Sequence, residues 1–458
     1  MDKIVSLCKR RGFVFQSSEI YGGFSSSYDY GPLGVEFKNN VKRAWWQAMV
    51  QQHDAVVGLD SSILMHPKIW EASGHVESFA DPLVDCKECK KRWRFDHLLE
   101  ARGIAADLDK KKSLPVDLSE LRCPDCGGEL TEPRNFNLLM KTFIGPIEED
   151  SAQAYLRGET CQGIYVNFPN VMDSQRVKLP FGIAQIGKAF RNEITPGNFT
   201  FRMREFEQME MQWFCRPADA PTWFEHWREQ RFAWYHRYGL KADSLRWRQH
   251  GANERAHYAK DAWDIECKFP FGDGEWKELA GVHNRGDWDL SRHSKFSGQD
   301  LSVREDAAGE KFFPYIVETS DGADRAALAF LVDAYTEVAA RSGEDDAKHE
   351  TEVVLRLHRD LAPIKIAILP LSKKEPLAAQ AKAVLDSVRS TWMCQYDETG
   401  SIGKRYRRQD EIGTPYCVTV DFDSIEDGKV TVRDRDTMAQ DRVAMAELKA
   451  YFSDKFSL

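Results

Sequence analysis

Residues 188–214 limit most strongly what this chain can fold into, because their side chains alternate as those of a β-hairpin do. Residues on one face of a strand recur at every second position. One face of the second strand then carries Arg202, Arg204, Phe206, Gln208 and Glu210. Its other face is largely apolar, with Phe201, Met203, Met209, Met211 and Trp213. On the first strand, Arg191 and Glu193 share a face with Gly187 and Ala189. The pattern predicts two strands joined by a Pro-Gly loop, with apolar packing behind them and a charged face in front.

The charged face offers arginines, carboxylates and one aromatic ring, the groups that hold a polyanion beside a stackable base. A half-exposed antiparallel hairpin with solvated, alternating charges produces the same pattern. The hairpin alone therefore leaves both interpretations open.

Composition narrows the class of protein. The chain has 458 residues, enough for two or three domains, and its 42% hydrophobic and 29% charged residues are typical of a globular protein. The net charge of -9 argues against non-specific coating of nucleic acid. A local basic patch can still bind it, because salt screens surface fields within roughly 10 Å. No apolar run suits a signal sequence or a membrane span, so we expect a cytoplasmic protein without a membrane partner.

Four of the ten cysteines form two Cys-x-x-Cys pairs, namely Cys86 with Cys89 and Cys123 with Cys126. This spacing lets a tight turn present two thiolates to one tetrahedral ion. The spacer between the pairs is longer than in most zinc ribbons, so unmetallated thiols remain an alternative to structural zinc. Four sulfur ligands would leave no open position for catalysis.

The remaining chain reads as two regions. In the first we expect a helix over 34–50, a strand over 55–65, an insertion over 82–134, a helix over 217–238, strands over 264–269, 276–282 and 312–322, a charged loop over 292–310 and a helix over 323–340. In the second we expect strands over 364–370, 392–396, 415–422 and 430–435 and helices over 374–389, 403–412 and 438–452. That cadence of strand and helix is typical of a small α/β domain with a parallel or mixed sheet.

Arg325 is predicted to lie in the first turn of the helix that follows Gly322, where unpaired amides and the helix dipole attract phosphate. A salt bridge from Asp321 or Asp324 that caps the helix is the alternative. Glu278, in a predicted strand, is a candidate ligand for magnesium, an ion that bridges phosphates.

The chemistry that these groups suit is attack of a carboxylate on an α-phosphate, which depends on positioning and charge neutralisation. It needs no catalytic triad. The chain has neither a G-x-x-x-x-G-K-[ST] loop nor a strand-helix G-x-G-x-x-G motif, so any nucleotide site must be of another type.

Several motifs of the chain resemble those of a known enzyme family. Residues 190–193 (FRNE) with 204–206 (REF) resemble motif 2 of the class II aminoacyl-tRNA synthetases, 321–325 (DGADR) resemble motif 3, and the helix from Gly34 with the strand ending at Pro67 is similar to the dimer-interface motif 1. Further segments resemble the dimeric bacterial glycyl-tRNA synthetases, namely 28–34 (YDYGPLG), 73–75 (SGH), 159–163 (ETCQG), 206–210 (FEQME) and 400–413 (GSIGKRYRRQDEIG). The resemblance covers nearly the whole chain.

The resemblance implies an α+β catalytic domain built on an antiparallel sheet over 1–360, with the Cys-x-x-Cys insertion at 82–134, and a C-terminal α/β anticodon-binding domain over 361–458. It implies ATP-dependent attachment of glycine to tRNA(Gly) through a glycyl-adenylate, by a homodimer that uses Mg²⁺. Structural Zn²⁺ is expected from the cysteine spacing alone, with unmetallated thiols as the alternative.

It also implies roles for particular residues. Arg191 and Arg325 are the expected catalytic residues, with Arg191 on the α-phosphate, Arg202 and Arg325 on the distal phosphates, Glu193 on the adenine side and Phe206 stacked on adenine. The expected ATP-binding residues are Arg191, Asn192, Glu193, Phe201, Arg202, Met203, Arg204, Glu205, Phe206, Glu278, Leu279, Gly322, Ala323, Asp324 and Arg325.

For glycine, the resemblance implies carboxylates around the ammonium group and Ser320 close to the α-carbon. The expected glycine-binding residues are Arg94, Glu159, Phe206, Glu207, Gln208, Met209, Glu210, Glu318, Thr319, Ser320, Asp321 and Gly322. An exposed arginine of the insertion, without contact to a substrate, would explain Arg94 nearly as well. Glycine offers no side chain to grip, so its site must exclude larger amino acids by sterics.

The expected tRNA-binding residues are Lys404, Arg405, Arg407 and Arg408, a basic run that contains a tyrosine and suits phosphates beside an unstacked base. Taken alone, such a run is also typical of a solvated helix face. Its position in the C-terminal domain favours the tRNA interpretation.

The chain departs from the family around the expected glycine pocket. Gly158 and Cys161 stand where relatives usually have Pro and Ala, and Thr319 stands where they have Pro. Lost prolines loosen the backbone by about 0.4–1 kcal/mol each through the unfolded state. We therefore expect weaker glycine binding than in a proline-bearing relative.

Two rival functions fit part of the pattern. An accessory protein that binds nucleic acid without catalysis would be free to lose Arg191, Phe206 or Arg325, yet all three are present. A class II synthetase for another amino acid is the second rival, against which the combination of Glu159, Glu210 and Ser320 argues.

Overall fold

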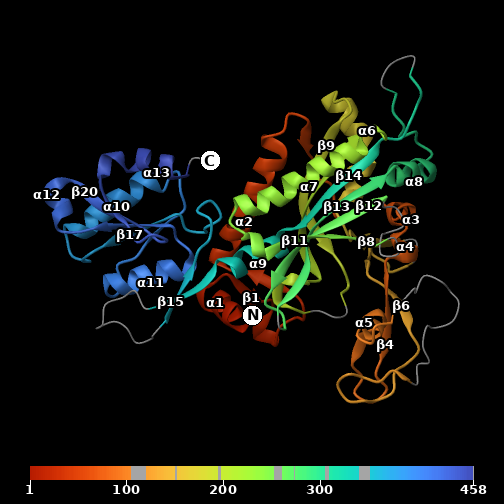
Figure 1. Ribbon diagram of the computed structural model, residues 1–458, viewed down its shortest axis with the longest axis horizontal. Coiled ribbons are helices and arrows are strands. Elements are labelled where there is room, and N and C mark those ends of the chain that lie inside the picture. Colours follow the sequence, from red (N-terminus) through yellow and green to blue (C-terminus); the bar gives the residue numbers. More distant parts are fainter. Residues whose placement is uncertain are drawn as a thin grey trace.

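The computed structural model describes residues 1–104, 120–149, 152–193, 197–251, 260–272, 274–304, 309–339 and 351–456. Figure 1 shows a central sheet with its helices, a C-terminal domain on one side and a small lobe containing β4, β6 and α5 at the opposite end. Within the described residues, no helix combines the length and apolarity that crossing a membrane requires.

The central sheet has seven strands, and the expectation of an antiparallel sheet is confirmed. In spatial order they are β11 (Leu245–Gln249), β12 (Asp261–Phe269), β13 (Glu275–Gly286), β14 (Tyr315–Gly322), β10 (Glu205–Cys215), β9 (Phe181–Phe190) and β3 (Val56–Gly58). Every pair of neighbours is antiparallel except β3 and β9.

Helices cover the two faces of this sheet unequally. On one face lie α2 (Pro32–Trp46), α7 (Ala220–Arg237) and α9 (Ala323–Ala334), packed on Met209, Met211 and Trp213 of β10. On the other face, α6 (Cys161–Gln175) and α8 (Trp288–Ser297) cover Phe214 and its neighbours. Within the described residues, neither group of helices covers the rest of that second face, which carries the candidate site.

The hairpin of 188–214 forms, but its strands are shifted. Arg191 and Glu193 follow the end of β9, and Arg202 and Arg204 precede the start of β10. A short 3-10 turn at Phe199–Phe201 lies between them. Strand parity therefore holds for 206–215 but does not apply to 191–204. Pro196 of the predicted Pro-Gly loop lies outside the described residues.

Other elements differ from the predictions. Of the strand predicted over 55–65, only β3 (Val56–Gly58) forms. The segment 292–310, predicted as a charged loop, begins inside α8. The helix over 323–340 ends at Ala334, because β15 (Tyr335–Ala339) pairs with β16 (Thr351–Leu355). Helix periodicity cannot reveal such a strand, since its stability comes from a partner distant in the sequence.

The insertion forms a lobe around a sheet with the order β5-β4-β6. Its elements are β4 (Ala80–Asp85), β5 (Arg92–Arg94), α5 (Phe95–Glu100) and β6 (Arg134–Asn137). A separate small core holds it together, with Val84, Phe95, Leu99, Leu121 and Leu130. The central part of the predicted insertion, 105–119, lies outside the described residues.

The C-terminal domain has a mixed five-stranded sheet, as expected. Its strands, in spatial order, are β18 (Cys394–Tyr396), β17 (Ile366–Pro370), β19 (Tyr416–Val420), β20 (Lys429–Asp434) and β21 (Gln440–Ala444). Its helices are α10 (Leu377–Val388), α11 (Ile402–Ile412), α12 (Asp423–Asp427) and α13 (Leu448–Phe456). The predicted helix 438–452 is wrong in its first part, where β21 pairs with β20.

The remaining elements lie in the N-terminal half. They are α1 (Asp2–Arg11), β1 (Val14–Gln16), β2 (Tyr28–Tyr30), α3 (Lys68–Ala72), α4 (His75–Ser78), β7 (Met140–Phe143) and β8 (Gln153–Leu156). Helix α2 continues into a π-helical turn at Gln47–Gln51.

Candidate active site

A cavity of about 190 Å³ opens on the uncovered face of the sheet, over β10, β13 and β14. Its walls include Glu159, Arg191, Glu193, Thr200, Phe201, Arg202, Met203, Phe206, Glu207, Gln208, Glu210, Glu278, Leu279, Gly281, His283, Arg285, Glu318, Ser320, Gly322, Asp324 and Arg325. In the sheet register, Glu210 is opposite Ser320, and Ser320 is opposite Gly281. Three strands thus supply one continuous wall.

One end of the cavity, here called the arginine end, contains Arg191, Arg202, Phe206 and Arg325. The Arg191 guanidinium carbon lies 5.4 Å from the centre of the Phe206 ring, and Arg191 Nε donates to the Gly158 carbonyl at 3.1 Å. These contacts hold a cation beside an aromatic ring, as the sequence predicted for the front of the hairpin.

Arg325 lies at the start of α9, as predicted, and closes the arginine end from the opposite side. Its Nε donates to the Phe201 carbonyl at 3.1 Å, and its guanidinium lies 4.5 Å from the centre of the Phe201 ring. Its Nη1 lies 3.3 Å from Glu278 Oε2. The three arginines therefore face one space from the hairpin loop and from a helix start, an arrangement suited to a chain of phosphates.

The other end, here called the acidic end, contains the carboxylates of Glu159, Glu210 and Glu318. Glu318 is 3.2 Å from Arg285 and 2.9 Å from His283 Nδ1. Burial opposes its ionisation, but the charge of Arg285 and the hydrogen bond from His283 outweigh burial and lower its pKa to about 2. Glu318 is thus a fixed negative charge.

Glu159 is likewise held by neighbours. Its Oε1 accepts from Cys161 Sγ at 3.0 Å and from Gln162 Nε2 at 2.9 Å, and its Oε2 lies 3.3 Å from His75 Nε2. Although burial opposes ionisation, the charge of His75 and its hydrogen bond, the charge of Arg285 and the hydrogen bond from Cys161 hold the pKa of Glu159 well below its usual value.

Glu210 has a different environment. It is 2% exposed, and its described hydrogen-bond donors are all neutral: Thr160 Oγ1 at 2.5 Å, Ser320 Oγ at 2.9 Å and Gln208 Nε2 at 3.0 Å. Among the described residues, no lysine, arginine or histidine forms an ion pair with it. Burial, and then the charges of Glu318 and Glu159, raise its pKa to about 8. A buried carboxyl without a cation is a site that a cationic ligand would stabilise.

Some residues expected to bind glycine or ATP lie on the opposite face. Met209, Thr319 and Ala323 are fully buried beneath the sheet, outside the cavity walls. Asp321 is 1% exposed and accepts from Trp45, Arg231 and Tyr235, so it neither faces the cavity nor caps α9, whose N-cap is Gly322. The resemblance marked whole segments, whereas alternate residues of a strand face opposite ways.

Four more expected residues lie outside the cavity walls, namely Arg94, Asn192, Arg204 and Glu205. Arg94 pairs with Asp81 and Asp96 of the insertion lobe. Arg204 Nε donates to the Glu193 carbonyl, and Glu205 pairs with Lys188.

Neither carboxylate proposed to cap α9 pairs with Arg325. The Asp324 carboxylate accepts from Tyr30 at 2.7 Å, from Lys38 at 3.2 Å and from the Glu207 amide at 2.7 Å. Glu207 itself pairs with Lys38 and Lys42.

The sequence reasoning missed four residues of the cavity walls, Thr200, Gly281, His283 and Arg285. Three of them alternate along β13, so the parity argument used for the hairpin would have found them once that strand was extended to Gly286.

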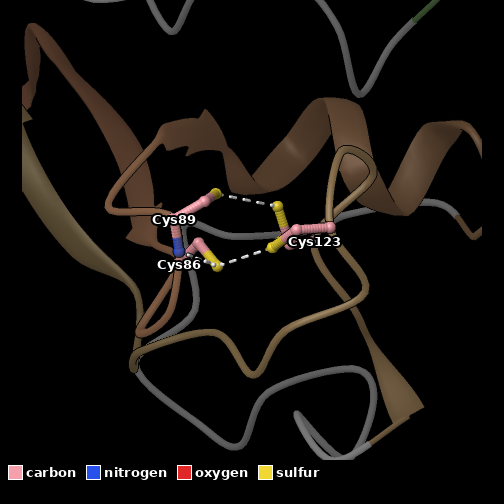
Figure 2. Close-up of side chains that lie close together, drawn as sticks. Cys86, Cys89 and Cys123 are labelled. Atoms are coloured by element: carbon pink, nitrogen blue, oxygen red, sulfur yellow. Dashed lines mark hydrogen bonds between the residues drawn. The ribbon is translucent and has the colours of Figure 1, made fainter.

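The four cysteines of the insertion come together, although the pairs are far apart in the sequence. Figure 2 shows the side chains of Cys86, Cys89 and Cys123 pointing toward one another. Sγ of Cys86 lies 3.5 Å from that of Cys126, and Sγ of Cys89 lies 3.6 Å from that of Cys123. Four sulfurs at such distances suit a tetrahedral metal ion.

The basic run on α11 is only partly on the surface. Arg405 is 2% exposed and donates to the Pro370 carbonyl at 2.5 Å, so its guanidinium cannot reach a phosphate. Arg407 pairs with Glu352 and Arg408 with Asp397, while Lys404 is exposed.

The C-terminal domain is similar to a known domain family. Residues 365–455 match the family of anticodon binding domains.

Similarity to individual proteins extends over nearly the whole chain. The chain is 56% identical to a glycine–tRNA ligase of Treponema denticola, covering 98% of this chain and 95% of that protein. It is 53% identical to one of Clostridium acetobutylicum, with 99% and 98% covered, and 51% identical to one of Thermobifida fusca, with 100% and 98% covered. Identity at this level over both full lengths shows common family membership, and the chain therefore belongs to the glycine–tRNA ligase family of enzymes.

Proposed function

We propose that this protein activates glycine with ATP and transfers it to tRNA(Gly), and that residues 1–360 form a class II synthetase catalytic domain. The observation that carries the proposal is Glu210, a buried carboxyl without a cationic partner among the described residues, in the same cavity as Arg191, Arg202 and Arg325. One end suits an ammonium group and the other suits a triphosphate.

In the proposed first step, the carboxylate of glycine attacks the α-phosphorus of ATP. An oxygen–phosphorus bond forms, the bond to the β-phosphate breaks, and glycyl-adenylate and pyrophosphate result. Arg191 would neutralise charge on the α-phosphate, and Arg202 and Arg325 would hold the distal phosphates. Phe206 would stack on adenine, with Glu193 beside it. In the second step a hydroxyl of the terminal ribose of tRNA attacks the glycyl carbonyl carbon. A carbon–oxygen ester bond forms, the bond to the phosphate oxygen breaks, and AMP leaves while the hydroxyl proton passes to solvent.

Glu210, Glu318 and Glu159 would surround the ammonium group, with Ser320 near the α-carbon. Ser320 donates to Glu210 at 2.9 Å, so the two are already oriented toward each other. Larger amino acids would clash with the strand wall on which Gly281, Ser320 and Glu210 lie opposite one another.

Two metal ions belong to this proposal. The carboxylate of Glu278, beside Arg325, would hold Mg²⁺, which supplies charge neutralisation on the phosphates. Cys86, Cys89, Cys123 and Cys126 would hold Zn²⁺, which ties the insertion (82–134) together without an open coordination position.

We further propose that residues 361–458 bind the anticodon region, with Lys404 the most accessible of the basic run. Arg407 and Arg408 could contribute only by leaving their carboxylate partners. The active form is proposed to be a homodimer, through the motif 1 elements α2 and β3.

The deciding experiment is amino-acid-dependent exchange of labelled pyrophosphate into ATP, run separately with each of the standard amino acids. We expect exchange with glycine alone. Exchange with a different amino acid would favour another synthetase specificity, and no exchange with any of them, even with tRNA present, would favour the accessory protein.

A further inference from the structure

The acidic end of the cavity contains a thiol as well as carboxylates. Ligand atoms of Cys161, Glu210 and Glu318 all lie within 4.8 Å of one another, and all three residues are buried. They come from three separate elements, the first residue of α6, the middle of β10 and the middle of β14. The fold, rather than a local sequence motif, brings them together.

We propose that Cys161, Glu210 and Glu318 form a binding site for a borderline-soft divalent cation such as Zn²⁺, which occupies the place of the ammonium group of glycine. Thiolate and carboxylate are both zinc ligands, at about 2.3 Å and about 2.0–2.2 Å. Ligand atoms around one tetrahedral ion lie roughly 3.5 Å apart, so an inward shift of roughly 1 Å completes the site. The fourth position would hold water from the cavity.

The charges around the cluster favour a cation. Within the described residues, the hydrogen-bond donors to Glu210 are Thr160, Gln208 and Ser320, all neutral. Glu318 is already paired with Arg285 and His283, so it brings a negative charge without requiring a new partner. A metal at Glu210 would supply the charge that its present neighbours lack.

Metal binding would change one existing contact. The Cys161 thiol donates to Glu159 Oε1 at 3.0 Å. On binding near pH 7, the thiol proton of Cys161 and the carboxyl proton of Glu210 both pass to solvent, and the sulfur becomes a thiolate ligand. Glu159 keeps its contacts to Gln162 and His75, so it stays fixed.

Cys161 also sets which metal the site would take. Alanine at this position would leave only oxygen ligands, which suit hard ions such as Mg²⁺. The thiol shifts the preference toward Zn²⁺ and Cd²⁺. Sensitivity of the glycine pocket to soft metals is therefore a property of this chain that a relative with alanine would not share.

Direct binding is tested with Cd²⁺ alone, followed by the ultraviolet charge-transfer band of thiolate bound to cadmium. The full-length protein is compared with Cys161→Ser, which keeps a hydrogen-bond donor to Glu159 but removes the soft ligand, and with Cys161→Ala. The four insertion cysteines contribute equally to all three proteins. We expect one additional equivalent of thiolate-bound Cd²⁺ in the unsubstituted protein, and equal titrations would overturn the proposal.

Competition with glycine is tested separately, and this part rests on the proposed function. In glycine-dependent pyrophosphate exchange at fixed Mg²⁺ and ATP, Zn²⁺ should raise the apparent KM for glycine and leave kcat unchanged. The inhibition constant should rise at least tenfold in Cys161→Ser and Cys161→Ala, each measured against its own metal-free rate.

Inhibition that is equal in all three proteins, or that excess glycine does not relieve, would overturn the site. If no amino acid supports exchange, the proposed function fails while the Cd²⁺ titration still decides whether the metal site exists.

Discussion

Glu210 and Glu318 lie on the adjacent strands β10 and β14 and face the same cavity, yet their surroundings favour opposite protonation states. Arg285 and His283 lower the pKa of Glu318 to about 2 against the effect of burial, whereas burial and the nearby carboxylates raise the pKa of Glu210 to about 8. One carboxylate is a permanent charge, and the other is charged when a cation arrives. Together they favour a cationic ligand over a neutral one.

Glu210→Gln should remove the proposed ammonium contact. We expect kcat/KM for glycine to fall roughly a hundredfold, since a lost buried charge partner costs about 2–5 kcal/mol. The KM for ATP should change little, because Glu210 lies at the acidic end. Glu205→Gln is the matched control, because Glu205 is an exposed carboxylate on the same strand, outside the cavity walls. Equal losses in the two variants would contradict the role given to Glu210.

Glycine binding should depend on pH through Glu210. With its pKa raised to about 8, Glu210 is mostly protonated at pH 7, and only its ionised form attracts ammonium. Because rising pH removes the competing proton, the apparent KM for glycine should fall roughly tenfold between about pH 6.5 and about pH 8. Calorimetry in two buffers of different ionisation enthalpy should show about one proton released per glycine bound at pH 7. Proton uptake would contradict this prediction.

The sequence pattern placed both Arg202 and Arg204 on the charged face, but the structure separates these two side chains. Arg202 lines the cavity, whereas Arg204 donates to the carbonyls of Glu193 and Ser25. We expect Arg202→Lys to raise the KM for ATP roughly tenfold, because lysine lacks the planar fork that binds phosphate at two points. Arg204→Lys should stay within about twofold, since lysine keeps a donor for the Glu193 carbonyl. The reverse order would contradict the placement of these side chains.

Thr319 is completely buried, and its Oγ1 has no hydrogen-bond partner among the described residues. Thr319→Val removes this buried hydroxyl with little change in shape. We expect the free energy of unfolding to rise by about 1 kcal/mol, measured by chemical denaturation. Thr319→Ala, which also removes a methyl group and leaves a cavity, should instead destabilise the protein. Weaker glycine binding in Thr319→Val at unchanged stability would indicate that Thr319 does take part in the pocket.

Zinc in the insertion lobe can be measured directly. Protein purified without chelator should contain zinc that is lost in Cys86→Ser and in Cys123→Ser, because each serine replaces one ligand of the four-cysteine cluster. Cys417→Ser, which changes a buried cysteine of the C-terminal domain, is the control. Removal of the metal should increase proteolysis within the lobe, whose own core is small. Zinc content unaffected by Cys86→Ser would exclude the site.

The parity of the hairpin predicted correctly which face Phe206, Gln208 and Glu210 share, because a regular strand allows no other arrangement. It failed for Arg204, because this residue precedes the start of β10 and is not part of a strand. The position of Arg325 at a helix start was equally predictable, since Gly322 and the apolar pattern of α9 mark the boundary locally.

The sequence by itself determined the family, the antiparallel sheet, the α/β nature of the C-terminal domain and the residue types at both ends of the cavity. These follow from local periodicity and from contiguous motifs. Only the tertiary structure decided which carboxylates are paired, because Arg285, His283 and Glu318 meet across two strands. It also decided that Asp321 and Arg405 are buried supports rather than ligands. Such assignments depend on neighbours distant in the chain, whose charges and burial set how each group behaves.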